Sequence, residues 1–252
     1  MEAEAEPEPE TAPLELPSPW APTAAVCVIG ASGDLAKRKT YPALFKLFLH
    51  GLLPSNLRIW GYARSANDDE GFREGMRSWL AKAATGHTEK LDEFLAACCY
   101  CQGQYDSAED FARLNAAVEA WEAGATDRHN RMFYLAIPPS VFGPAAQSIK
   151  ASAMAPDLSW TRVIVEKPFG HDLASSDALD EELGQLLSEE QIYRIDHYLG
   201  KEMVQNLAAV RVPRCLSGRP LRAASSSRCS SQRPASAVAA LSPECTAVGA
   251  VW

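Results

Sequence analysis

Two short segments of the sequence carry residue types suited to binding a dinucleotide and a phosphorylated substrate. Residues 30–37 place two glycines directly after an apolar run. Glycines at a strand-to-helix turn permit a tight bend and let backbone N–H groups approach a pyrophosphate at the helix N-terminus. The spacing is G-x-x-G, not the full G-x-G-x-x-G, so an ordinary β–α turn is the alternative. The candidate cofactor-binding residues of this turn are Gly30, Ala31, Ser32, Gly33, Asp34, Leu35, Ala36 and Lys37.

The second segment, residues 194–201, combines an acid, an imidazole, a phenol and an ammonium just past an apolar stretch. His197, Tyr198 and Lys201 are donors of the kind that a phosphate group needs. Oxidation of a sugar hydroxyl also needs a base to accept its proton, commonly an oriented His, and Asp196 is suited to orient one. The alternative is that Asp196 caps a helix and has ordinary surface neighbours.

Two further cations lie where strands are expected to end. Arg64 follows the second apolar run, where NAD-binding folds usually carry an acid for the ribose 2′-hydroxyl. An Arg there instead accommodates a 2′-phosphate, which favours NADP over NAD. Lys167 ends a later run, and ligands of open α/β sheets bind outside the carboxyl ends of the strands. Either cation could instead simply face solvent, and Pro168 is compatible with a trans or a cis peptide bond.

The elements that must position these residues alternate between strands and helices. Pro42 should kink the first helix or delay its start, and Gly51 suits a C-terminal cap. The alternation predicts an α/β fold with a Rossmann-like, doubly wound and mainly parallel sheet. The predicted strands cover residues 24–29, 57–62, 131–137, 161–165 and 192–195. Helices are predicted over 34–49, 177–187 and 199–207, with mostly helical structure over 69–121.

The two ends of the chain differ in composition from the middle. Residues 1–22 carry six Glu and no basic residue, whereas residues 208–252 carry six Arg and no Lys. We expect both ends to be disordered tails around a cofactor-binding domain over residues 23–207. An acidic, Pro-rich start matches neither a secretory nor an organelle signal, so the cytoplasm is the expected location.

Composition argues against several other classes of protein. The net charge is −8, and no region has the basic footprint of a nucleic-acid-binding protein. No apolar run approaches the roughly 20 residues that span a bilayer. Cys98 and Cys101 have C-x-x-C spacing, but no second pair follows at a spacing suited to zinc, so we expect free thiols and no metal site.

With these motifs in order, the sequence resembles the glucose-6-phosphate dehydrogenases from about residue 24 to residue 207. Residues 30–37 resemble the family's NADP-binding turn, and Gly61-Tyr62-Ala63-Arg64 resembles its 2′-phosphate site. Residues 166–170 are similar to its Glu-Lys-Pro-Phe-Gly segment, and residues 194–207 to its signature. The resemblance implies oxidation of D-glucose 6-phosphate to 6-phospho-D-glucono-1,5-lactone with NADP+, the first step of the oxidative pentose phosphate pathway.

The resemblance also implies roles for single residues. Lys167 would contact both cofactor and substrate, and Asp196 would orient the catalytic base. The sugar phosphate would be held by Lys167, His197, Tyr198 and Lys201. Phe142 stands where some members have a tyrosine that contacts the cofactor.

The largest departure from the family comes after Leu207. The family continues there into an α+β domain that carries the base histidine and most of the dimer interface, and no His follows His197 here. We therefore expect this chain alone to be nearly inactive, and its tail reads like sequence translated out of frame or through an intron. The alternatives are a non-catalytic NADP-binding fragment, another dinucleotide reductase, or a misassembled gene model.

Overall fold

The computed structural model describes residues 23–124, 129–156, 159–196, 201–204 and 206. The expected tails over 1–22 and 208–252 lie outside the described residues, as does much of the helix expected over 199–207.

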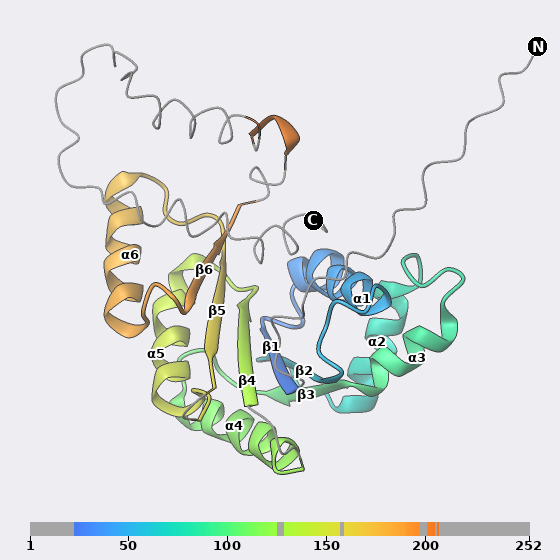
Figure 1. The fold of residues 1–252 in the computed structure, drawn as a ribbon. Helices are drawn as coiled ribbons and strands as arrows, with labels where there is room; N and C mark the ends of the chain where they lie inside the picture. Colours follow the sequence, from blue (N-terminus) through green and yellow to red (C-terminus); the bar gives the residue numbers. More distant parts are fainter. Residues whose placement is uncertain (1–22, 125–128, 157–158, 197–200, 205, 207–252) are drawn as a thin grey trace, which may run out of the picture.

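Within the described residues, a six-stranded, wholly parallel sheet forms the centre of the fold (Figure 1). The strand order is β3-β2-β1-β4-β5-β6. This is the doubly wound order of dinucleotide-binding folds, in which the order reverses between the first and fourth strands. The predicted Rossmann-like fold class is confirmed. The strands are β1 Thr23–Ile29, β2 Asn56–Ala63, β3 Cys98–Gln102, β4 His129–Leu135, β5 Thr161–Glu166 and β6 Ile192–Ile195.

Helices cover the sheet on both sides, with α1, α2 and α3 on one side and α4, α5 and α6 on the other (Figure 1). A π-helical turn, Ala36–Thr40, precedes α1, and a 3₁₀ turn, Pro139–Val141, precedes α5. The helices are α1 Tyr41–Leu49, α2 Asp69–Leu80, α3 Thr88–Ala96, α4 Ala108–Glu122, α5 Phe142–Ser152 and α6 Leu173–Leu186.

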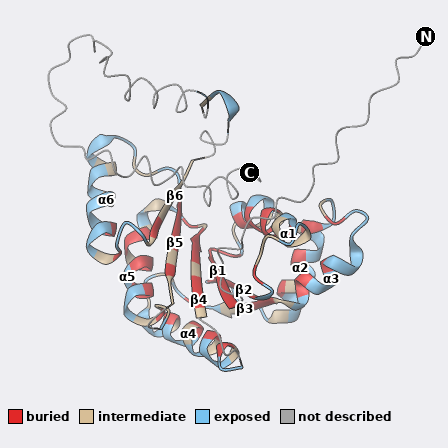
Figure 2. Ribbon diagram, in the orientation of Figure 1, coloured by how far each residue is buried: buried red, intermediate tan, exposed pale blue. Residues whose placement is uncertain are grey.

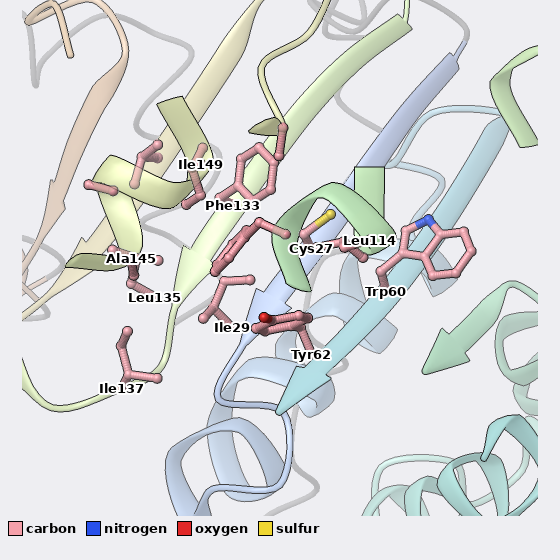
Figure 3. Close-up of a cluster of buried hydrophobic side chains, with 14 of the residues drawn as sticks. Cys27, Ile29, Trp60, Tyr62, Leu114, Phe133, Leu135, Ile137, Ala145 and Ile149 are labelled. Carbon is pink, nitrogen blue, oxygen red and sulfur yellow. The ribbon is translucent and has the colours of Figure 1, made fainter. Parts of the chain in front are cut away.

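The apolar run of β1 is continuous because both of its faces are buried. Cys27 and Ile29 point into the core beneath α4, α5 and α6, whereas Val26 and Val28 point into the core beneath α1, α2 and α3. Figure 2 shows the resulting band of buried residues along the central strands. Figure 3 shows Phe133 of β4 beside Cys27 and Ile29 in the first of these cores.

One strand was missed by the sequence analysis. β3 lies inside the stretch predicted to be mostly helical, so that prediction is wrong for Cys98–Gln102. The strand is short, and it stands between two helices with regular apolar spacing, α3 and α4. A five-residue run gives too little alternation to outweigh its helical flanks.

Three element boundaries follow from local chemistry. The chain is already helical before Pro42, so the predicted late start is wrong; the proline follows the π-helical turn Ala36–Thr40 directly and stands in the first turn of α1, where its missing N–H costs least. Gly51 has a positive φ of 66°, as a residue that ends a helix requires. Asp172 caps α6 in a reciprocal capping box with Ser175, so this helix starts at Leu173 and not near residue 177 as predicted.

A buried ion pair joins β4 to the end of α4. Arg131 of β4 is only 2% exposed, and its Nε lies 3.0 Å from Oε1 of Glu122 at the end of α4. Its Nη1 also donates to the backbone oxygens of Ala153 and Met154, at 3.2 and 3.0 Å. A charge buried this deeply is tolerated because it is paired and hydrogen-bonded on several sides.

Candidate functional site

The glycine turn lies where the strand order reverses, between β1 and β4. Gly30 has a φ of +92°, and a Cβ atom there would lie 2.3 Å from the backbone oxygen of Ala136, just past β4. The N–H groups of Gly30 and Ala31 donate to the Tyr62 oxygen at 2.8 and 3.1 Å, and Gly33 N–H donates to the Gly30 oxygen at 2.8 Å. The turn is therefore held between the ends of β2 and β4, where this fold class binds a dinucleotide.

Side chains after the turn form an open groove on the α1 and α2 side. The groove is lined by Asp34, Lys37, Arg38, Pro42 and Trp79. Lys37 Nζ lies 5.1 Å from the centre of the Trp79 ring, a cation–π contact. Arg38 Nε lies 2.9 Å from Oδ1 of Asp34 in an exposed ion pair. Two cations therefore follow the glycine turn closely, which suits an anionic ligand.

Arg64 lies directly past the end of β2, exposed, as the sequence predicted. Its guanidinium carbon is 5.3 Å from the centre of the Tyr105 ring. Gln102 of β3 holds the Arg64 backbone by donating from Nε2 to its oxygen at 3.1 Å. Burial raises the pKa of Tyr105, and the neighbouring Arg64 lowers it.

Tyr105 was missed by the sequence analysis. It stands just past β3, and the missed strand is what brings it beside Arg64. An accurate prediction of β3 would have been the signal, because residues past the carboxyl ends of neighbouring parallel strands meet at one edge of a sheet.

The ends of β5 and β6 bring two predicted site residues together. Lys167 Nζ lies 3.2 Å from Oδ1 of Asp196, and both side chains are a little over one-third exposed. The Lys167–Pro168 peptide bond is cis, which settles the alternative that the sequence left open. Beside Lys167, the carboxylate of Glu166 accepts a hydrogen bond from the buried Tyr134 hydroxyl. Neither Glu166 nor Tyr134 was singled out in the sequence.

The remaining predicted site residues fall into three groups. His197 and Tyr198 lie outside the described residues. Lys201 is exposed, and its backbone oxygen accepts a hydrogen bond from Val204 at 2.9 Å. Phe142, at the start of α5, is 1% exposed and packs in the core beneath α4, α5 and α6.

The described part of the chain contains four cysteines. Cys27, Cys98, Cys99 and Cys101 are free thiols, the first three of them buried. Within the described ranges, no cluster of three or more His, Cys, Asp or Glu side chains could hold a metal ion. In the same ranges, no helix has the length and apolar content to cross a bilayer.

Comparison with known proteins matches residues 27–206 to the family described as "Glucose-6-phosphate dehydrogenase, NAD binding domain". The chain belongs to the glucose-6-phosphate dehydrogenase family. The matched range begins inside β1 and ends past β6, so it includes the glycine turn, Arg64, Lys167 and Asp196.

Members of this family from distant organisms resemble the chain closely. It is 50% identical over 194 residues to glucose-6-phosphate 1-dehydrogenase 5, cytoplasmic, of Arabidopsis thaliana, covering 74% of this chain and 38% of that protein. It is 48% identical over 185 residues to glucose-6-phosphate 1-dehydrogenase of Caenorhabditis elegans, covering 73% of this chain and 35% of that protein. The chain thus spans little more than a third of the length of these relatives.

Solved structures of the glucose-6-phosphate dehydrogenase family share the fold. One, a glucose-6-phosphate dehydrogenase in complex with glucose 6-phosphate, has a TM-score of 0.69 and 44% identity. The alignment covers 76% of this chain and 40% of that one. A second, the glucose-6-phosphate 1-dehydrogenase of Mycobacterium avium, has a TM-score of 0.61 and 30% identity over the same shares.

Proposed function

We propose that this chain is the NADP-binding part of a glucose-6-phosphate dehydrogenase and binds NADP+ at the carboxyl ends of β1 and β4. The observation that carries the proposal is the Gly30 turn, which lies where the strand order reverses and has no room for a side chain. A turn of this shape lets backbone N–H groups approach a pyrophosphate without interference from a Cβ atom. The cofactor-binding residues are then those of the turn, residues 30–37, together with Arg64 and Lys167.

Arg64 selects NADP+ over NAD+ in this proposal. Its exposed guanidinium lies past β2, and no acidic residue stands among residues 61–66 to bind a ribose 2′-hydroxyl. A guanidinium can bind a 2′-phosphate through charge-assisted hydrogen bonds, and its stacking on Tyr105 limits the orientations it samples.

The residues at the ends of β5 and β6 form the proposed substrate-binding part of the site. Lys167 supplies positive charge, and Asp196 holds its ammonium at 3.2 Å. In the proposed site, Lys167, His197, Tyr198 and Lys201 bind glucose 6-phosphate, while Asp196 orients the base that removes the proton of the sugar hydroxyl. Bound NADP+ would supply the hydride acceptor, and the product would be 6-phospho-D-glucono-1,5-lactone. By its relatives' names the family has cytoplasmic and chloroplastic members, and we propose the cytoplasm and the oxidative pentose phosphate pathway here.

The proposal is tested by titrating the full chain with NADP+ and with NAD+ in a calorimeter. We expect NADP+ to bind more tightly, and the Arg64→Gln variant to lose about 10- to 100-fold in NADP+ affinity with little change for NAD+. Lys90→Gln is the matched control, because Lys90 is an exposed cation on α3 paired with Glu93. Equal affinity of the wild-type chain for the two cofactors would contradict the role given to Arg64.

A second measurement separates catalysis from binding alone. NADPH formation is followed after glucose 6-phosphate is added to the chain with NADP+. Little turnover is expected from this chain alone, so turnover at ordinary enzyme rates that is lost in Lys167→Ala would overturn that expectation and support the complete enzyme. NADP+ binding without turnover fits the expectation and also fits the alternative, a non-catalytic NADP-binding protein.

A further inference from the structure

A buried tyrosine, Tyr134, links β4 to the end of β5 beside the candidate site. Tyr134 of β4 is 4% exposed and lies opposite Val28 of β1 and Ile164 of β5. Its hydroxyl donates a hydrogen bond to Oε1 of Glu166, the last residue of β5. Burial, and then the Glu166 carboxylate, raise the pKa of Tyr134 well above its ordinary value, whereas Thr40 lowers it. The phenol therefore keeps its proton and remains a donor to Glu166.

The same tyrosine lies next to the segment that follows the glycine turn. Thr40 ends the π-helical turn Ala36–Thr40 and is 1% exposed. Its hydroxyl lies close enough to that of Tyr134 to lower the pKa of the phenol. Tyr134 thus stands between the segment expected to bind the cofactor phosphates and the strand that ends at Glu166.

The connection from β5 to α6 lies close to neighbouring residues at two points. At its far end, Gly170 has a φ of +133°, and a Cβ atom there would lie 2.6 Å from the backbone nitrogen of Ser176 in α6. At its near end, Glu166 is held by Tyr134. Lys167 lies between these points, adjacent to Glu166, with its Nζ 3.2 Å from Oδ1 of Asp196.

We infer that Tyr134 is a positioning residue whose hydrogen bond to Glu166 sets the start of this connection and thereby keeps the Lys167 ammonium beside Asp196. Its effect on ligand binding rests on the proposed function, because that is what gives Lys167 a ligand. Tyr134 itself is buried and acts through Glu166 and Lys167.

The test compares Tyr134→Phe with Tyr41→Phe in the full chain. Tyr41 is a matched control, because its hydroxyl is also buried but has no hydrogen-bond partner in the described part of the chain. The first readout is the rate at which an amine-reactive ester labels Lys167 in the ligand-free chain, followed by mass spectrometry, with Lys90 as internal reference. We expect labelling of Lys167 to accelerate about 2- to 10-fold in Tyr134→Phe only, the factor that matches one hydrogen bond of ordinary net strength. The dissociation constant for NADP+ should rise by a similar factor.

Changes at Glu166 test the same bond from the other side, including the case in which Tyr134→Phe does not fold. Glu166→Ala and Glu166→Gln both remove the charge, but only the glutamine oxygen can still accept from Tyr134. Lys167 should be labelled as fast in Glu166→Ala as in Tyr134→Phe. Labelling should be no faster in the double variant, because both changes remove the same hydrogen bond. Glu166→Gln should retain the slower labelling.

Two outcomes separate this inference from the proposed function. If Tyr134→Phe and Glu166→Ala only lower the melting temperature and leave Lys167 labelling unchanged, Tyr134 is structural and the inference is wrong. If the wild-type chain binds no NADP+ while the labelling contrast appears, the positioning role stands and the proposed function fails.

Discussion

Replacing Gly30 with alanine tests the central feature of the site, the close approach of the glycine turn to the end of β4. Two costs add at this position. An L-residue at a φ of +92° is strained by about 1–3 kcal/mol. The new Cβ would also lie 2.3 Å from the Ala136 oxygen and 2.8 Å from Cγ2 of Ile137. Overpacking of this kind costs about 1–3 kcal/mol more, and a backbone oxygen cannot turn aside as a side chain can.

Two other glycines supply matched controls. Gly51→Ala meets nothing within 4 Å but has a φ of +66°, so it should cost only the strain of a left-handed residue, about 1–2 kcal/mol. Gly184→Ala stands in α6 with open space around it and should stabilise the protein by about 0.5–1 kcal/mol, because alanine favours a helix over glycine.

The assay is urea unfolding of the three variants and the wild type at one pH, with free energies taken from the midpoints and slopes. We expect the order Gly184→Ala, wild type, Gly51→Ala, Gly30→Ala, from most to least stable, with Gly30→Ala losing about 2–6 kcal/mol in total. If Gly30→Ala costs no more than Gly51→Ala, the turn does not approach Ala136 closely, and the argument for a backbone-lined phosphate site fails.

Two further predictions concern buried groups away from the site. Arg131→Met should cost about 3–5 kcal/mol in urea unfolding because it leaves the Glu122 carboxylate buried without its partner; the double variant with Glu122→Leu should recover most of that loss, and equal losses in the two would contradict this. Burial raises the pKa of Cys27 from 9.0 to about 12, so the folded state holds this proton more firmly than the unfolded chain. Stability should therefore fall by up to about 1.4 kcal/mol per pH unit as the pH rises from about 9 to about 12. Cys27→Ala should make this slope shallower in unfolding measured as a pH series, and an unchanged slope would show that Cys27 does not contribute.

Much of the site could be predicted because its signals are local. The Gly30 turn follows an apolar run whose two buried faces make it a strand, and Pro42 marks where the π-helical turn gives way to α1. Arg64 and Lys167 were placed correctly past strand ends, since a strand boundary can be read from where the apolar pattern stops. Lys167 and Asp196 were each singled out, but their ion pair required that β5 and β6 be neighbours.

By itself, the sequence determined the fold class, most strands and the identity of the residues at the ends of those strands. Tertiary structure alone decided which of those ends meet. β3 is too short to be recognised locally, and only its pairing with β2 brings Tyr105 to Arg64. Likewise, pairing of β4 with β5 brings the Tyr134 hydroxyl to Glu166. The physical reason is that strand order is set by packing of helices over the whole sheet, whereas apolar periodicity reports only whether a segment is buried.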